Sequence, residues 1–198
     1  MSCKVNVLLD LDQTLISAEG DDEYNPEKSK DKAKKFISHD MDGYYIVFER
    51  PGLQEFLDYL FKNFNVSVWT AASKDYATFI VEKILLQNKP ERNLDWIFFS
   101  YHCDISKKLK NGSKDLSTLW DIYKVDGYNK DNTVIIDDYD EVYKTQPSNC
   151  IIAKPFEFSD KKSYQDTYLA KLKDAMCDIK TIEPSKMVND KLKDYCKE

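Results

Sequence analysis

Short apolar runs alternate along the chain with amphipathic segments of helical period. Residues 5–9 (VNVLL), 65–70 (NVSVWT) and 133–136 (TVII) have the length and the β-branched, aliphatic composition of buried strands. Apolar residues repeat at helical spacing after Pro51, between the first strand and the second, and again over 75–87, between the second strand and the third. Strands that alternate with helices predict an α/β fold with helical crossovers. We therefore expect a doubly wound, mostly parallel sheet.

Two smaller features are expected beside this sheet. Residues 35–38 and 44–48 flank Asp42-Gly43, a dipeptide that favours positive φ, and so predict a β-hairpin after the first strand. Residues 88–113 contain a strand-like aromatic run followed by a basic, glycine-containing run. We interpret this stretch as a small β insertion before Lys114.

The rest of the chain completes one domain. The charged segment 19–35 has few apolar anchors and predicts a mobile loop. The remaining elements are expected to be two helices and a last short strand: 116–123, 162–177 and 150–153. We expect a single domain over 1–180, with its insertion at about 88–113, and a solvated C-terminal tail over 181–198.

Composition narrows the class of protein. The chain has 198 residues, 42% of them hydrophobic and 32% charged, which is typical of a globular domain with a sizeable core. Its net charge of −6 argues against a general nucleic-acid binder, although local basic patches remain compatible with it. The five cysteines are widely spread without a zinc-type spacing, so we expect reduced thiols.

No segment of the sequence predicts a membrane protein or a secreted one. The apolar runs are too short to span a bilayer, and the first residues lead directly into a strand without a signal-peptide core. We therefore expect an intracellular, soluble protein of the nucleus or cytoplasm, with no membrane partner and no direct nucleic-acid binding.

Polar side chains stand at the ends of three predicted strands. Asp10 and Asp12 follow the first strand, Thr70 ends the second, and Asp137 and Asp138 follow the third. Because parallel strands end at the same edge of a sheet, these groups are expected to meet there. Carboxylates gathered so closely repel one another unless a hard cation binds between them, and Mg²⁺ prefers oxygen ligands together with phosphate. The pattern is typical of magnesium-assisted phosphate chemistry.

Each of these residue types has a possible role in phosphoryl transfer. Asp10 could attack phosphorus to form an aspartyl-phosphate, and Asp12 could protonate the leaving oxygen and then deprotonate the attacking water. Phosphoryl transfer also needs groups that hold the phosphate, for which Thr70, the amides after it and Lys114 are the candidates.

The order of these residues resembles a known superfamily. They form four groups along the chain: Asp10-x-Asp12-x-Thr14, Thr70, Lys114 and Asp137-Asp138. This order resembles the four motifs of the haloacid-dehalogenase superfamily of phosphatases. Three longer stretches, 50–57 (RPGLQEFL), 69–77 (WTAASKDYA) and 114–117 (KDLS), resemble the small RNA polymerase II C-terminal-domain phosphatases, or NLI-interacting-factor-like family. The resemblance covers roughly residues 4–156.

The resemblance implies a haloacid-dehalogenase-like fold and an Mg²⁺-dependent phosphatase of phosphoserine and phosphothreonine in proteins. The RNA polymerase II C-terminal domain is then a candidate substrate. Asp10 would be the nucleophile, and Asp12 the acid and base, whose backbone carbonyl also contacts the metal. Asp138 would bind the metal through its side chain, with Asp137 in support.

The resemblance places other residues around the phosphate. Thr70 and Lys114 would hold it, with Thr14 and the Ala71 region beside them. Arg50 has two equally weighted roles, one with the substrate and one as the structural partner of an acid.

Other functions share these motifs. A non-catalytic phosphopeptide-binding scaffold of the same fold is one alternative, and a phosphatase of small metabolites or nucleic-acid ends is another. Intact catalytic positions favour an enzyme over the scaffold. The basic run 107–110 is expected to be a solvated turn, with contact to an acidic phosphopeptide as its alternative.

Overall fold

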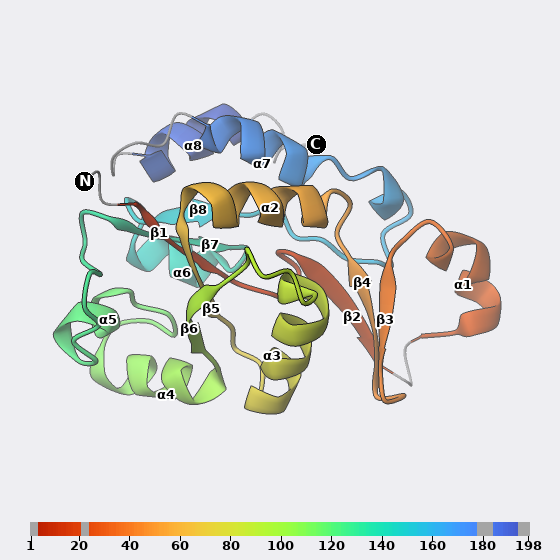
Figure 1. Ribbon diagram of the computed structural model, residues 1–198, viewed down its shortest axis with the longest axis horizontal. Coiled ribbons are helices and arrows are strands. Elements are labelled where there is room, and N and C mark those ends of the chain that lie inside the picture. The colour runs from red at the N-terminus through yellow and green to blue at the C-terminus, as the bar shows by residue number, and fades with distance from the viewer. Residues whose placement is uncertain (1–3, 21–23, 178–183, 194–198) are drawn as a thin grey trace.

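Five parallel strands form the central sheet of the computed structural model, which describes residues 4–20, 24–177 and 184–193 (Figure 1). In spatial order the strands are β6 (Leu94–Phe98), β5 (Asn65–Trp69), β1 (Asn6–Leu9), β7 (Thr133–Asp137) and β8 (Cys150–Ile152). The expected doubly wound, mostly parallel sheet is confirmed.

Helices cover both faces of this sheet because side chains alternate along β1. Val7 and Leu9 face the larger core, whereas Leu8 faces the smaller one. The larger core is covered by α2 (Leu53–Asn63), α7 (Tyr168–Met176) and α8 (Pro184–Leu192), and by α3 (Lys74–Ile80) with the π-helical turn η1 (Val81–Leu86). The smaller core is covered by α4 (Ser100–Leu109), α5 (Ser117–Asp121) and α6 (Asp140–Thr145).

The predicted hairpin is confirmed and belongs to a second sheet. Strands β3 (Ser38–Met41) and β4 (Tyr45–Glu49) pair antiparallel, and β2 (Ile16–Gly20) pairs with the other edge of β4. At the turn, Asp42 and Gly43 have φ of 49° and 79°, and the Asp40 side chain accepts a hydrogen bond from the Gly43 N–H at 2.7 Å. The three-stranded sheet thus starts a few residues after the end of β1, beside the carboxylates.

The mobile loop expected over 19–35 is wrong for the described residues. β2 extends to Gly20, and α1 (Pro26–Ala33) follows, while residues 21–23 lie outside the described ranges. The helix begins with local signals, since Asn25 caps the Lys28 N–H and Pro26 occupies the first turn. None of the α1 residues is buried, so no apolar periodicity could have revealed the helix.

The strand expected within 88–113 is confirmed, but it joins the main sheet as its edge strand β6 and does not form a separate small insertion. The basic run of this stretch lies in the last turn of α4 and just beyond. Helix α4 buries Cys103 and Ser106 against the smaller core. The segment is therefore part of the sheet and its helical cover.

The C-terminal segment is packed where the structure describes it. In α8, Val188 and Leu192 are 0% and 3% exposed, and the Asn189 amide bonds both to the Ile152 N–H and to the Cys150 carbonyl at the edge of β8. The expected solvated tail is thus wrong for residues 184–193. Residues 181–183 and 194–198 lie outside the described ranges, and the domain boundary at 180 stays a prediction.

Two further observations complete the fold. The helix predicted over 162–177 is divided into a 3-10 turn, η2 (Ser163–Gln165), and α7. Within the described ranges, no helix combines the length and apolar character needed to cross a membrane.

Candidate active site

The carboxyl ends of the three central strands meet at one edge of the sheet. β1 lies between β5 and β7, and Leu9 pairs with Val68 on one side and with Ile136 on the other. The residues that follow, Asp10 and Asp137, are therefore neighbours across the edge. This confirms the convergence predicted from chain order.

A buried ammonium group joins two of the carboxylates. The Lys114 Nζ donates to Asp10 Oδ1 at 2.5 Å and to Asp137 Oδ2 at 2.7 Å, and all three side chains are at most 8% exposed. The Thr14 Oγ1 lies 3.2 Å from Asp10 Oδ2 and 3.2 Å from Asp138 Oδ1. Five of the predicted site residues thus form one connected cluster.

The cluster strongly perturbs its own protonation. Burial and the charge of Asp10 raise the pKa of both Asp137 and Asp138 above the usual carboxyl range. Burial by itself favours neutral Lys114, but the carboxylates of Asp10 and Asp137 outweigh it and raise the pKa of that ammonium group. Lys114 therefore stays charged among acids that resist full ionisation.

Asp12 lies beside the cluster and is held by a tyrosine. The Tyr76 hydroxyl donates to Asp12 Oδ1 at 2.5 Å, and the Tyr76 ring packs edge-on against Tyr45 of the hairpin, with ring centroids 5.6 Å apart. Burial raises the pKa of Asp12 to about 6; the Tyr76 hydrogen bond opposes that rise and the charge of Asp10 adds to it. A carboxyl with this pKa can both give and take a proton near neutral pH.

Sequence reasoning placed Tyr76 only on the apolar face of its helix. The Ser73 side chain caps the helix by accepting from the Tyr76 N–H, which puts Tyr76 in the first turn, close to the sheet edge. That cap was readable in the sequence and could have identified the position.

The loop that carries Lys114 is held by polar side chains that sequence reasoning also missed. Ser106 Oγ donates to the Gly112 carbonyl at 2.6 Å, and Glu141 accepts from the Ser113 N–H at 3.1 Å and from the Ser113 hydroxyl at 3.0 Å. Gln146 donates to the Lys114 carbonyl at 2.7 Å. Helices α4 and α6 thereby fix the backbone from which the ammonium group reaches Asp10.

Thr70 and Ala71 follow β5 at the same edge of the sheet. Thr70 is 1% exposed, and its hydroxyl accepts from the Ala72 N–H at 3.1 Å, whereas Ala71 is exposed. Their expected contact with phosphate stays a prediction.

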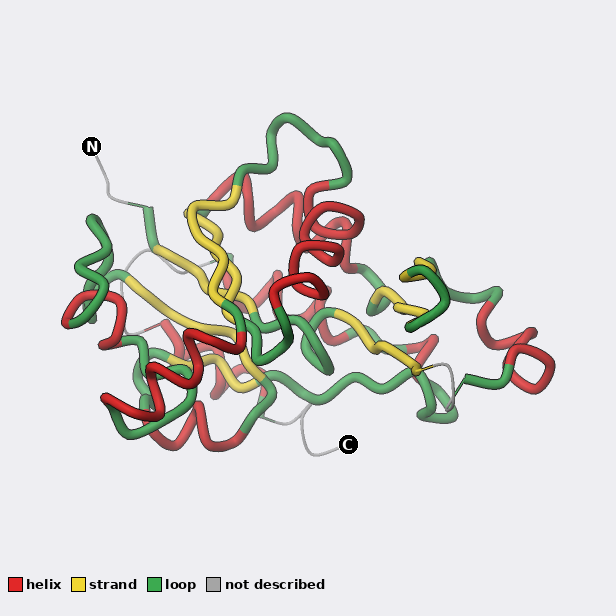
Figure 2. The backbone as a smooth tube through the Cα atoms, turned by 90° about the horizontal axis from the view of Figure 1, so that it is seen from below, coloured by secondary structure: helices red, strands yellow, loops and turns green. Residues whose placement is uncertain are grey.

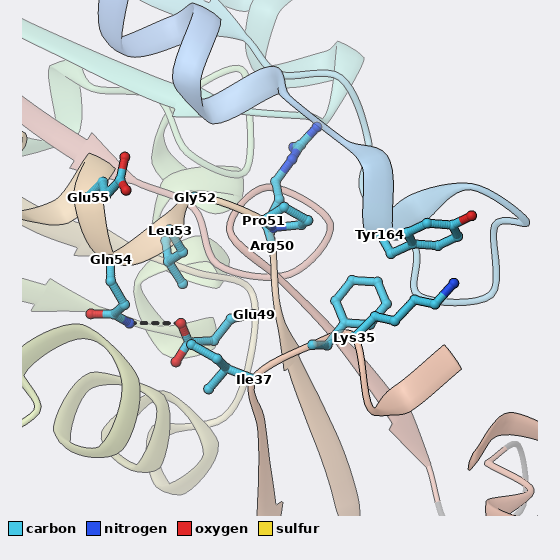
Figure 3. A pocket seen from close by; sticks show the side chains of 11 residues that line it. Lys35, Ile37, Glu49, Arg50, Pro51, Gly52, Leu53, Gln54, Glu55 and Tyr164 are labelled. Atoms are coloured by element: carbon cyan, nitrogen blue, oxygen red, sulfur yellow. Dashed lines mark hydrogen bonds between the residues drawn. The ribbon is translucent and has the colours of Figure 1, made fainter. Parts of the chain in front are cut away.

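Arg50 is engaged in a structural ion pair. Its guanidinium binds both carboxylate oxygens of Asp166, at 3.1 and 3.0 Å, and donates to the carbonyls of Thr14 and Lys154. The side chain is 0% exposed. A pocket of about 310 Å³ opens beside Pro51 and Glu49, and Figure 3 shows the Arg50 guanidinium pointing away from it. These contacts favour the structural one of the two expected roles.

Three carboxylates are placed to share a cation. Oxygen atoms of Asp10, Asp137 and Asp138 all lie within 4.8 Å of one another. Oxygen-only donors suit Mg²⁺, and together with Asp12 the acids outnumber the one ammonium group of Lys114. The donor set therefore fits the cation that the sequence predicts.

Comparison with known proteins identifies the family. Residues 5–186 match the NLI interacting factor-like phosphatases. A CTD phosphatase-like protein, 355R, of Invertebrate iridescent virus 6 is 46% identical over 175 residues, which are 86% of this chain and 96% of that protein. The ubiquitin-like domain-containing CTD phosphatase 1 of Danio rerio is 24% identical, over 72% of this chain and 45% of that protein.

A solved structure supports the fold. The structure of Fcp1, an essential RNA polymerase II CTD phosphatase, aligns with a TM-score of 0.60 at 17% identity. It covers 90% of this chain, which spans 63% of the Fcp1 chain. Fold, site geometry and the family match over most of the sequence agree: this chain belongs to the NLI interacting factor-like phosphatase family.

Proposed function

We propose that this protein is an Mg²⁺-dependent phosphoprotein phosphatase that hydrolyses phosphoserine and phosphothreonine through an aspartyl-phosphate. The observation that carries the proposal is the contact of one buried carboxylate, Asp10, with the Lys114 ammonium group inside a cluster of further acids. A nucleophile beside a fixed cation and metal-ligating oxygens is the arrangement that phosphoryl transfer needs.

The first half of the reaction transfers the phosphoryl group to the protein. Asp10 attacks phosphorus, the bond from phosphorus to the ester oxygen breaks, and Asp12 gives that oxygen its proton. Lys114 and the Thr70 region hold the phosphate oxygens, and Tyr76 keeps the Asp12 carboxyl in place.

The second half releases phosphate. Asp12, now ionised, takes a proton from water, the water oxygen attacks phosphorus, and the bond to Asp10 breaks. Asp10, Asp138 and the Asp12 carbonyl would hold Mg²⁺ with Asp137 in support, and the bound ion would supply positive charge that offsets repulsion between the acids and the phosphate.

The substrate that we propose is a phosphorylated polypeptide, with the RNA polymerase II C-terminal domain as the first candidate. The CTD phosphatase names of several relatives support this choice. Intact Asp10, Asp12 and Lys114 favour catalysis over the scaffold alternative.

Hydrolysis of an aryl phosphate with Mg²⁺ tests the reaction. We expect turnover by the parent protein that EDTA abolishes and that Asp10→Asn lowers by roughly 10³-fold or more. Turnover that survives either change would reject the mechanism, and an inactive parent would favour the scaffold. A panel of phosphopeptides against phosphorylated sugars and nucleotides then separates the substrate classes.

A further inference from the structure

Helix α1 contributes nothing to either core and carries mostly charge. None of its residues is buried, and the stretch 26–35 contains five lysines, Lys28, Lys30, Lys32, Lys34 and Lys35. Figure 2 shows the helix projecting at the end of the molecule, beyond the three-stranded sheet. A helix without an apolar face is held by other contacts, which are formed here by its lysines and the aromatic residues next to it.

Those contacts place α1 against the segment that precedes α7. The Lys32 Nζ donates to the Asp160 carbonyl at 2.6 Å and lies 4.8 Å from the centre of the Phe158 ring. The Lys35 Nζ lies 3.7 Å from the centre of the Tyr164 ring, and Figure 3 shows the two side chains together. Helix α1 and residues 154–171 therefore form one continuous surface.

The second half of this surface contains a basic hollow. Its volume is about 690 Å³, and its lining includes Lys154, Lys161, Lys162 and Lys171. The lining also contains three acids, Glu157, Asp160 and Asp166, of which Asp166 is neutralised by its ion pair with Arg50.

We call residues 26–35 and 154–171 together the lysine face. It contains nine lysines and five acidic residues, an excess of four positive charges in a chain whose net charge is −6. An acidic protein repels a phosphorylated substrate at long range, and a concentrated positive face reverses that repulsion locally. The charge asymmetry therefore marks where a polyanion can approach.

The lysine face contacts the loop that follows β1 and carries Asp12. The Phe156 N–H donates to the Gln13 carbonyl at 2.7 Å, and the Gln13 amide lies 3.4 Å from Glu157 Oε1. Gln13 directly follows Asp12 in the sequence. A polypeptide whose phosphorylated residue enters the carboxylate site can thus continue over the hollow.

We propose that the lysine face binds an acidic segment, rich in carboxylate or phosphate groups, of the same polypeptide substrate. This inference rests on the proposed function and narrows its substrate class to proteins with an acidic or multiply phosphorylated sequence near the target residue. Among the described residues, the ammonium groups of Lys28, Lys30, Lys161 and Lys162 form no hydrogen bond or ion pair with one another or with other side chains, so they can bind a ligand. A long nucleic acid fits less well, because it would also pass the acidic remainder of the surface.

Binding of two labelled phosphopeptides tests the proposal. Each peptide carries one phosphoserine. In the first pair the phosphoserine is followed by a run of glutamates in one peptide and by a run of glutamines in the other. In a second pair the same runs precede the phosphoserine. In EDTA, where turnover stops, we expect the parent protein to bind a glutamate peptide about fivefold more tightly by fluorescence anisotropy. High salt should remove the difference.

Charge reversal on the face supplies the second arm. The double variants Lys161→Glu/Lys162→Glu and Lys28→Glu/Lys30→Glu should lose the preference for the glutamate peptide. The matched control, Lys83→Glu/Lys130→Glu, changes the net charge equally at exposed positions elsewhere and should keep it. Hydrolysis of a small aryl phosphate should be unchanged in all three, which separates this inference from the proposed function.

Three results would overturn the inference. The first is equal affinity of the parent for the glutamate and glutamine peptides. The second is a control variant that loses the preference for the glutamate peptide as much as the lysine-face variants do. The third is a single-stranded RNA of the same charge that binds as tightly as the glutamate peptide and is equally sensitive to the lysine variants. Should the parent hydrolyse no aryl phosphate, the proposed function fails, while the binding measurement still decides whether the face selects acidic polypeptides.

Discussion

Tyr76 shows how one hydroxyl group can set the geometry of the candidate acid. Its hydrogen bond to Asp12 is made by a side chain whose ring is packed against the hairpin, so the position of the carboxyl depends on both α3 and β4. A proton donor must point at the leaving oxygen, and a freely rotating carboxyl does so only part of the time. The hydroxyl therefore orients the group that transfers the proton.

Tyr76→Phe removes that bond and keeps the ring. We expect kcat for a phosphopeptide to fall about tenfold, because the carboxyl that transfers the proton loses the hydrogen bond that orients it. KM should change little, because this hydrogen bond does not involve the substrate. Steady-state kinetics check this, together with a thermal midpoint that shows the fold is intact. A rise in KM at constant kcat would instead indicate that Tyr76 contacts the substrate.

Lys114 is the counter-charge for two buried acids. Its replacement by Met leaves Asp10 and Asp137 without a counter-charge, so we expect the free energy of unfolding in EDTA to fall by about 3–5 kcal/mol, as measured with urea. The half-exposed pair of Lys110 and Asp121 is the control, and Lys110→Met should cost less than about 1 kcal/mol. Equal effects of the two changes would contradict the buried ion cluster.

At the scale of elements, the strands that deliver the acids were predictable and some of the helices were not. The strands around Leu9, Val68 and Ile136 are continuous apolar runs, and their order along the chain fixes which ends meet. Helix α1 has no apolar stripe, so its caps were the only signal. The basic run after Ser106 was predicted to be a turn, because the lysines at the end of α4 are not buried and give no apolar period. Only Cys103 and Ser106 of this helix are buried.

Helix α8 was missed because its apolar content is small. Val188 and Leu192, four positions apart, pack in the larger core beside β8, yet one such pair in a mostly polar segment is weak evidence of a helix. Tertiary burial, absent from the local sequence, decides the outcome.

Leu192→Ala tests whether α8 belongs to the domain. We expect the free energy of unfolding to fall by about 2–4 kcal/mol, since a fully buried leucine leaves a cavity. The exposed neighbour Lys193 is the control, and Lys193→Ala should change stability by less than about 0.5 kcal/mol. An unchanged free energy of unfolding in Leu192→Ala would instead indicate that this segment is the solvated tail that the sequence predicted.

At the scale of the whole molecule, a cluster of acids and a surface with an excess of lysines lie next to each other. The acids gather at the sheet edge, where a cation is expected, and the lysine face lies beside them on the three-stranded sheet side. Chain order predicted the first feature. The second depends on contacts between residues more than a hundred positions apart, such as Lys32 with Asp160, and only the folded structure reveals it.

The carboxylate cluster makes overall stability depend on pH and on Mg²⁺. The pKa values of Asp12 and Asp138 are raised to about 6 and that of Asp137 to about 7, so the contribution of these acids to stability is complete below about pH 4 and is lost as pH rises through about 6 to 7. A bound cation favours the ionised acids and restores the loss.

We therefore expect Mg²⁺ to raise the thermal midpoint more at pH 7.5 than at pH 5, where it competes with protons. At ten times its Kd the ion should add about 1.4 kcal/mol, and Asp138→Asn should reduce this gain. Scanning fluorimetry with and without EDTA measures it. An equal shift at both pH values, or the same shift in the variant, would place the ion elsewhere.

The central claim is that Asp10, within this cluster, accepts the phosphoryl group. The most direct measurement is to mix the protein with an aryl phosphate and Mg²⁺, quench with borohydride, which reduces an aspartyl-phosphate to homoserine, and map the product by mass spectrometry. Asp12→Asn should raise the trapped fraction, because the intermediate loses the base that hydrolyses it. We predict homoserine at position 10; turnover with no trapped product there, or with the product at another acid, would contradict the account.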